Sequence, residues 1–478
     1  MTGMRLSAQE IDARTPAGRN RYADALRLLS ILVVVYGHWL IAVVTVRDGR
    51  LDGASLLALV PATQWLTWIF QVMPLFFFVG GFANAAAYRS ARGRGITWAD
   101  WVRGRARRLL RPVLPLVVLW VPVGGVLAYL GVPGEMVRFA TQIVIVPVWF
   151  LAAYLVVCAL VPLTYALHER FGVGVVAVSA AIAVGVDGLH LAGVPIVGWS
   201  NFLWVWGAVH QAGYLWHDSD RAAAGEPGVR QRLPRAAGPA LALAVTGFAL
   251  LILLTTVGGY PLSMVGVGDG SRSNNSPPSI ALLALATAQV GLALAARRPA
   301  ERLLARPRAW GAVVVTGSFT MTVYLWHQTA MVAVAAALVP TGIWPVTARV
   351  DAIWWWQRPL WLAICTLALA AVVPLFGRFE HAGTPRSRPS AIRAAVGVTL
   401  ATAGLGLLVF GGLHRPGTVT GVPWLELGLL GVGLGALGVL RRPARPDHLP
   451  APGGAAEPSE VAPPESEAAG SVAPGRSG

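Results

Sequence analysis

The chain has 478 residues, of which 55% are hydrophobic and only 13% are charged. Soluble domains carry about 25% charged residues, so this composition excludes an ordinary soluble enzyme and indicates repeated membrane crossings. The formal net charge is +16, but all 38 basic residues are arginines that lie in short segments between apolar stretches. We interpret these arginines as signals of membrane topology, and we expect no binding of nucleic acid.

Twelve stretches are long and apolar enough to cross a bilayer, because a spanning helix needs roughly 20 mostly apolar residues. The sequence therefore predicts an all-α integral membrane protein with about 12 transmembrane helices. In chain order the predicted spans are 24–46, 63–87, 112–130, 142–167, 172–191, 195–216, 237–257, 279–296, 311–338, 360–377, 391–413 and 422–440.

The arginines also predict the orientation of these helices. If the N-terminus lies inside and each helix reverses the side, inside segments and the inner end of the first helix hold 31 of the 38 arginines, and outside segments hold 7. Cytoplasmic segments carry such an excess, so both termini are predicted to lie in the cytoplasm. The absence of lysine beside abundant alanine, glycine, proline and arginine suggests a GC-rich genome, and hence a bacterial inner or plasma membrane.

We divide the chain into four parts. Residues 1–19 form a cytoplasmic N-terminal segment without the apolar core of a signal peptide, and residues 20–381 form a ten-helix membrane domain. Residues 382–442 add two transmembrane helices. Residues 443–478 are rich in proline, alanine, glycine and glutamate, a composition that cannot bury a core, so this tail is predicted to be disordered.

The first predicted helix carries the most informative ionisable residues, which are costly in lipid and therefore functional candidates. Asp24 and Arg27 are three residues apart and can pair. Arg27 and His38 are eleven residues apart, close to three helical turns, so they share one face. At the helical rise, His38 lies about 16 Å deeper than Arg27. If Arg27 marks the cytoplasmic boundary, His38 lies near the bilayer midplane.

This geometry suits transfer of an acyl group from acyl-CoA. Arginines at the inner face can hold the phosphates of the donor, and a neutral histidine at mid-depth can take the proton of an acceptor hydroxyl as it attacks the thioester. A thioester is already activated, so no metal or tightly bound cofactor is required. The alternative for His38 is a packed histidine bonded to a backbone carbonyl, and for Arg108 and Arg111 it is topology anchoring.

Several motifs together resemble the type 3 membrane acyltransferases, integral membrane proteins that O-acylate polysaccharides, peptidoglycan, lipids and antibiotics. The resemblance covers about residues 20–380, with Gly80 where relatives usually have serine. The motifs are Asp24, Arg27 and His38 in the first helix, Phe76–Phe82 in the second, Arg108, Arg111 and Pro112 at the start of the third, Trp149–Tyr154 in the fourth, Ser318–His327 in the ninth, and Phe379-Glu380 after the tenth.

The resemblance implies a role for each matching residue. His38 would be the catalytic base, and Asp24 would be a second catalytic residue of the same motif. Arg27, Arg108 and Arg111 would bind acyl-CoA, most simply acetyl-CoA. The acceptor would be an extracytoplasmic or membrane-embedded hydroxyl compound. Candidate substrate contacts are Trp149, Tyr154, Tyr324, His327 and Glu380.

Three alternatives remain open in the sequence. His327 lies about 24 Å from the inner end of its predicted helix, where it could orient an acceptor or make a structural hydrogen bond. Twelve helices with both termini inside also fit a transporter or flippase, although the two halves show no obvious similarity. A third interpretation is an export or assembly partner without chemistry of its own. The oligomeric state cannot be inferred from the sequence.

Overall fold

The computed structural model describes residues 7–47, 50–268, 270–346, 349–380, 390–418 and 420–440. These residues are mostly helical, with one two-stranded sheet. Among them, nine helical spans are long and apolar enough to cross a membrane, or ten if the pair α6–α7, bent by 45°, forms one span. The predicted all-α membrane architecture is confirmed in outline. The predicted disordered tail lies outside the described residues.

The elements follow one another along the whole described chain. In order they are α1 (Ala8–Ala13), α2 (Arg21–Ile41), β1 (Ala42–Arg47), β2 (Arg50–Ser55), α3 (Leu56–Leu59), the 3-10 helix η1 (Pro61–Leu66), α4 (Thr67–Phe70), α5 (Met73–Gly93), α6 (Trp98–Leu110), α7 (Val113–Tyr129), α8 (Gly134–Ile145), α9 (Val148–Phe171), α10 (Val173–Leu191), α11 (Pro195–Gly198), α12 (Asn201–Ala223), α13 (Ala237–Thr256), α14 (Ile280–Leu304), α15 (Pro307–Gly317), α16 (Thr320–Leu338), α17 (Ala352–Phe376), the 3-10 helix η2 (Gly377–Glu380), α18 (Ala391–Gly411) and α19 (Trp424–Ala436).

The predicted number of twelve spans is not reached in the described residues. Two predicted spans account for much of the difference. α12 is long enough, but its last two turns carry Asp218, Asp220 and Arg221, and it does not count as an apolar span. α19 is apolar but has only 13 residues, whereas a helix that crosses the hydrocarbon core needs about 20.

The first predicted helix is wrong at its C-terminal end. α2 ends at Ile41, and residues 42–46 form most of strand β1, which pairs antiparallel with β2 in a register that sets Ala42 opposite Ser55. The segment Val43-Val44-Thr45-Val46 is entirely β-branched, which favours an extended backbone over a helix. In the sequence Asp48-Gly49 separates the strands, a dipeptide preferred between hairpin strands.

Two later predicted boundaries are also corrected. The predicted span 311–338 is broken, because α15 ends at Gly317 and α16 begins at Thr320. α17 begins at Ala352, eight residues before the start expected for helix 360–377. Its N-cap is Asp351, whose side chain accepts a hydrogen bond from the backbone N–H of Trp354. Trp354 to Trp356 therefore belong to a helix rather than to a loop.

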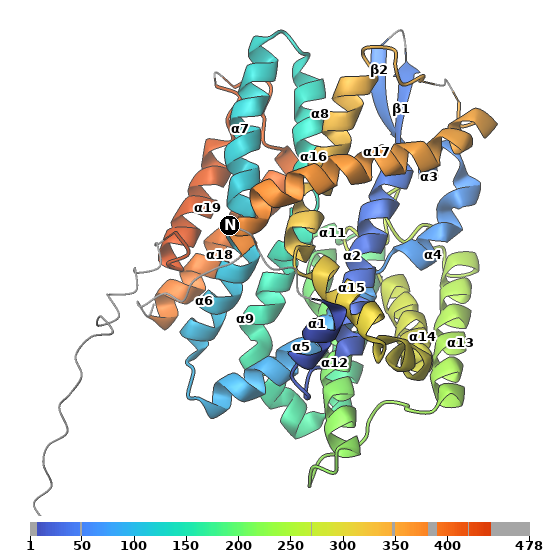
Figure 1. The fold of residues 1–478 in the computed structure, drawn as a ribbon, viewed down its shortest axis with the longest axis vertical. Helices are drawn as coiled ribbons and strands as arrows, with labels where there is room; N and C mark the ends of the chain where they lie inside the picture. Colours follow the sequence, from blue (N-terminus) through green and yellow to red (C-terminus); the bar gives the residue numbers. More distant parts are fainter. Residues whose placement is uncertain are drawn as a thin grey trace, which may run out of the picture.

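The helices form two groups joined by a central set (Figure 1). One group contains α5, α10, α12, α13 and α14, and the other contains α6, α7, α8, α18 and α19. α9 contacts members of both groups, and α2 and α16 pack against each other between them, with α17 crossing them. This packing brings the α2 and α16 motifs, distant in the sequence, to one place.

The helix ends and connecting segments lie at two ends of the molecule, as the alternation of spans predicts, and contacts within each end hold them together. At one end, which we call the arginine end, Arg92 binds Glu169 and Arg297 binds Asp220. Arg89 and Arg221 both bind Glu226, and the Arg221 hydrogen bond is the main reason that the pKa of Glu226 is lowered to about 2. Which end faces the cytoplasm stays a prediction.

At the opposite end, which we call the hairpin end, segments predicted to lie outside meet one another. Trp68 donates to the carbonyl of Leu262, and Arg358 donates to the carbonyl of Ala42 at the start of the hairpin. Phe139 lies against Gly53, where a Cβ atom would come within 2.2 Å of the ring. These contacts enclose a cavity beneath the hairpin.

Candidate functional site

A cavity of about 500 Å³ lies under the hairpin end. This volume is within the range of small-molecule sites, about 300–1,000 Å³. His38 lines the cavity from α2, and Tyr324, Gln328 and Met331 line it from α16. The three α16 residues are spaced four and three apart, so they share one face of their helix. Trp149 completes this part of the wall from α9.

His38 is bonded to a second histidine behind the cavity wall. Its Nδ1 lies 2.8 Å from Nε2 of His327, and the two rings are almost coplanar, with an angle of 4° between them. His327 is fully buried, and its Nδ1 lies 2.6 Å from the carbonyl oxygen of Tyr324. The Trp39 indole donates to the backbone carbonyl of His327, which fixes α2 against α16.

These bonds determine the tautomers of the two neutral rings. A carbonyl oxygen can only accept, so His327 Nδ1 must carry the proton. His327 Nε2 is then an acceptor, and His38 Nδ1 must donate to it. His38 Nε2 is left with a free lone pair, and no described residue binds it. The half-buried His38 therefore presents a base on the wall of the cavity.

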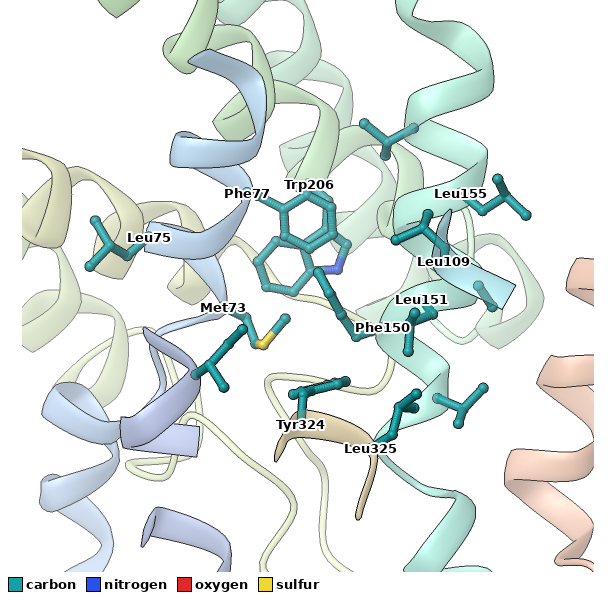
Figure 2. Close-up of a cluster of buried hydrophobic side chains, with 14 of the residues drawn as sticks. Met73, Leu75, Phe77, Leu109, Phe150, Leu151, Leu155, Trp206, Tyr324 and Leu325 are labelled. Atoms are coloured by element: carbon teal, nitrogen blue, oxygen red, sulfur yellow. The ribbon is translucent and has the colours of Figure 1, made fainter. Parts of the chain in front are cut away.

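A cluster of packed aromatic and aliphatic side chains includes Met73 and Tyr324, which also line the cavity, and we call this cluster the floor of the cavity (Figure 2). The Phe77 ring stacks on Trp206 with a centroid distance of 4.7 Å. Phe150 packs between Tyr324, which lines the cavity, and Tyr154, which lies further along α9, with centroid distances of 5.9 Å and 5.4 Å. In this structure Phe150 therefore separates the cavity from the region around Tyr154, and a ligand that joins the two regions would have to displace the Phe150 ring.

Beyond this floor the predicted donor-binding arginines are partly brought together. The charges of Arg27 and Arg105 act on both Arg108 and Tyr154, which places α2 and α6 arginines around one tyrosine of α9. Arg27 and Arg108 are exposed. Arg111 follows Arg108 by one turn as the C-cap of α6, and its charge acts on Arg107.

The hydroxyl of Tyr154 belongs to a buried polar cluster that joins three helices. Asn84 of α5 lies 3.2 Å from this hydroxyl, 3.4 Å from the sulfur of Cys158 and 3.0 Å from Nε2 of His210. A Cβ atom at Gly80 would come within 2.8 Å of the Tyr154 ring, so the missing side chain leaves room for it. Through Asn84, the cluster connects Tyr154, which lies near the arginines, to His210 of α12.

The structure separates Asp24 and Glu380 from His38. Asp24 pairs with Arg19 at 2.7 Å and with Arg27 at 3.2 Å, and it lies about 21 Å from His38 along α2. The predicted Asp24–Arg27 pair is thus present, and the predicted catalytic role of Asp24 cannot involve direct contact with His38 in this structure. Glu380 accepts from the backbone N–H and hydroxyl of Thr322, so it caps the start of α16.

The other predicted contacts lie at or near the cavity. Trp149 and Tyr324 line it, and the Tyr324 hydroxyl donates to the carbonyl of Pro147 at 2.7 Å. Tyr154 lies beyond the floor. His327 supports His38 from behind, and because α16 begins at Thr320 it lies only about 10 Å from the start of its helix rather than the expected 24 Å.

Sequence reasoning missed Gln328, Arg105 and Asn84. Gln328 follows the predicted His327, and its spacing from Tyr324 is a signal that could have placed it on the same face. Arg105 is three residues before Arg108 and shares its side of α6. Asn84 offers no signal beyond being a polar residue within an apolar span. Across the described parts of the chain, no group of three or more His, Cys, Asp or Glu residues could hold a metal ion.

Comparison with known proteins identifies one family. A family model described as an acyltransferase domain matches residues 20–378, which includes both histidines of the pair and the arginines of α2 and α6. No match was found among curated proteins or among solved structures.

Proposed function

Because this chain belongs to the type 3 acyltransferase family, whose domain covers residues 20–378, we propose that it moves an acyl group, most simply acetyl, from acyl-CoA to a hydroxyl group. The acceptor would belong to a cell-envelope glycan, a lipid or a secondary metabolite. The protein would work in a bacterial inner or plasma membrane, with the donor at the arginine end and the acceptor at the hairpin end.

The observation that carries this proposal is the histidine pair on the cavity wall. An acceptor hydroxyl in the cavity donates to the free Nε2 of His38, and its oxygen attacks the thioester carbonyl. The C–O bond forms and the C–S bond breaks, and the proton taken by His38 passes to the leaving thiolate of CoA. His327 stabilises the imidazolium because its Nε2 accepts from His38 Nδ1 throughout.

The arginine end supports the donor side of the proposal. Arg27 and Arg108 are exposed and lie near each other, with Arg105 beside them. Guanidinium groups stay charged and bind phosphate in a bidentate manner. Arg27 and His38 share one face of α2 and are about 16 Å apart along it. A donor held by its phosphates at Arg27 would therefore bring its thioester arm to His38 only after the Phe150 ring moves aside.

The test compares two histidine variants of the full-length protein in lipid nanodiscs. His38→Ala removes the base, and we expect acetyl transfer from radiolabelled acetyl-CoA to fall by about 10²- to 10⁴-fold. The matched control is His190→Ala, because His190 is a half-buried histidine of α10 that does not line the cavity, and its ring is bonded to the carbonyl of Pro195. Both variants should retain the elution profile and melting temperature of the wild type. Undiminished transfer by His38→Ala would refute the assigned role.

A further inference from the structure

The described walls of the cavity carry no Asp, Glu, Lys or Arg side chain. Apart from His38, they consist mainly of apolar and aromatic residues from α2, α5, α8, α16 and the hairpin. Moving an ionised group into such surroundings costs several kcal/mol unless a partner compensates it. An anionic or cationic acceptor would find no compensating charge on these walls.

Most polar groups on the walls are already used by the protein. The hydroxyls of Thr63 and Thr67 donate to backbone carbonyls of the same segment. The amide of Gln71 accepts from the backbone N–H of Met73 and donates to the side chain of Asn275. These groups stabilise the loops around the cavity and leave little hydrogen-bonding capacity for a highly hydroxylated ligand.

Gln328 differs from these residues. It lines the cavity, only 6% of it is exposed, and its Oε1 has no hydrogen-bond partner among the described residues. A buried polar atom without a partner costs about 1–3 kcal/mol. This oxygen is covered by protein atoms, so a ligand in the cavity satisfies it once the Gln328 side chain turns toward the cavity. Gln328 is also adjacent to His327 in the chain and faces the same cavity as His38. Its carboxamide offers both a donor and an acceptor.

We propose that the acceptor is an uncharged, mainly apolar alcohol, which places its polar end between Gln328 and His38 and its apolar body against the remaining walls. This proposal rests on the proposed function and narrows its acceptor. Gln328 acts as a specificity-determining residue, and the alcohol hydroxyl supplies the proton that His38 accepts. The products are a carboxylic ester and free CoA.

Binding is tested first, with full-length protein in nanodiscs and a 12-carbon alcohol that bears a diazirine. After illumination, labelled peptides should contain cavity residues of α2 and α16, and excess 1-dodecanol should suppress the labelling whereas glucuronic acid should not. Labelling confined to lipid-facing residues, or not suppressed by 1-dodecanol, would overturn the proposal.

Turnover is tested next, with acetyl-CoA and either 1-dodecanol or glucuronic acid as acceptor. Gln328→Leu keeps the size of the side chain and removes its hydrogen bonds, so we expect KM for 1-dodecanol to rise by up to about tenfold, with kcat changing less. Gln357→Leu is the matched control, because the Gln357 Oε1 is also buried without a partner but does not line the cavity. An equal effect of both variants would contradict the role of Gln328.

The outcomes separate this proposal from the proposed function. His38-dependent acetylation of glucuronic acid, without binding or acetylation of 1-dodecanol, would overturn the acceptor class and leave the acyltransferase reaction intact. Suppressible labelling of the cavity together with acetyl transfer that does not depend on His38 would support the ligand class and refute the catalytic assignment.

Discussion

His38 and His327 are 289 residues apart in the chain, and their ring nitrogens lie 2.8 Å apart. The rarity of ionisable groups within apolar helices makes each of them a candidate in the sequence. Their hydrogen bond could not be predicted, because it depends on how α2 packs against α16 and on where α16 begins. The backbone carbonyl of Tyr324 also binds His327. The sequence does not show where a backbone carbonyl will lie.

Other single residues also show which contacts can be predicted from spacing in the sequence. The Asp24–Arg27 pair follows from a spacing of three within one helix and was predicted. Arg108 and Arg111 have the same spacing, and Arg111 follows Arg108 by one turn as the C-cap of α6. Glu380 was predicted as a substrate contact, and in the structure its carboxylate accepts from the backbone N–H of Thr322 in the first turn of α16. Local spacing predicts local pairs, whereas contacts between helices require the packing.

At the scale of elements, three helix pairs approach closely at glycines. A Cβ atom at Gly213 of α12 would lie 2.1 Å from the carbonyl oxygen of Phe78 in α5. Gly247 and Gly291 play the same part between α13 and α14, and Gly404 and Gly433 between α18 and α19. Small residues at such crossings let backbones approach in membrane proteins. These glycines therefore allow the three helix pairs to pack closely.

The α5–α12 crossing gives a direct test with two glycines of one helix. Gly213→Ala should destabilise the protein by about 1–3 kcal/mol, because the added methyl group meets the α5 backbone, which cannot rotate away. Gly207→Ala is the control, because no heavy atom outside its own helix lies within 4 Å of an added Cβ there. Thermal unfolding in detergent should show a lower midpoint for Gly213→Ala alone. Equal midpoints would mean that the crossing does not depend on close approach.

The sequence predicted the existence of the helices better than their ends. Long apolar stretches identify spans because the bilayer demands them. The helix ends depend on local sequence features that hydropathy averaged over a long stretch does not resolve. The β-branched segment after Ile41 forms a strand, and the break after Gly317 shortens α16. The missed break overestimated the distance of His327 from the start of its helix, and the missed strand hid the hairpin that lies over the cavity.

At the scale of the whole molecule, the connecting segments gather at the arginine end and the hairpin end. The arrangement agrees with the alternation predicted from the arginines, and it separates the exposed guanidinium groups of Arg27 and Arg108 from the uncharged cavity around His38. An enzyme built in this way would bind a charged donor on one side and an apolar acceptor on the other. The direction in the membrane decides from which compartment each substrate comes.

Cysteine labelling in intact bacterial cells tests that direction. Ser271→Cys lies in the exposed segment at the hairpin end, and Ala224→Cys is exposed at the arginine end. Both native cysteines are buried and contribute little background. A membrane-impermeant maleimide should label Ser271→Cys in intact cells and Ala224→Cys only after permeabilisation. The reverse pattern would place the arginine end outside the cell, where it could not bind cytoplasmic acyl-CoA, and would contradict the proposed donor site.

The most direct test of the histidine pair is a double-mutant cycle on kcat/KM for acetyl transfer, using His38→Ala, His327→Ala and the double variant. If the two rings act as one unit, His327→Ala lowers the rate by disturbing the tautomer and orientation of His38, and the double variant is no slower than His38→Ala alone. A double variant slowed by the product of the two single effects would show that the histidines act independently and would contradict the mechanism.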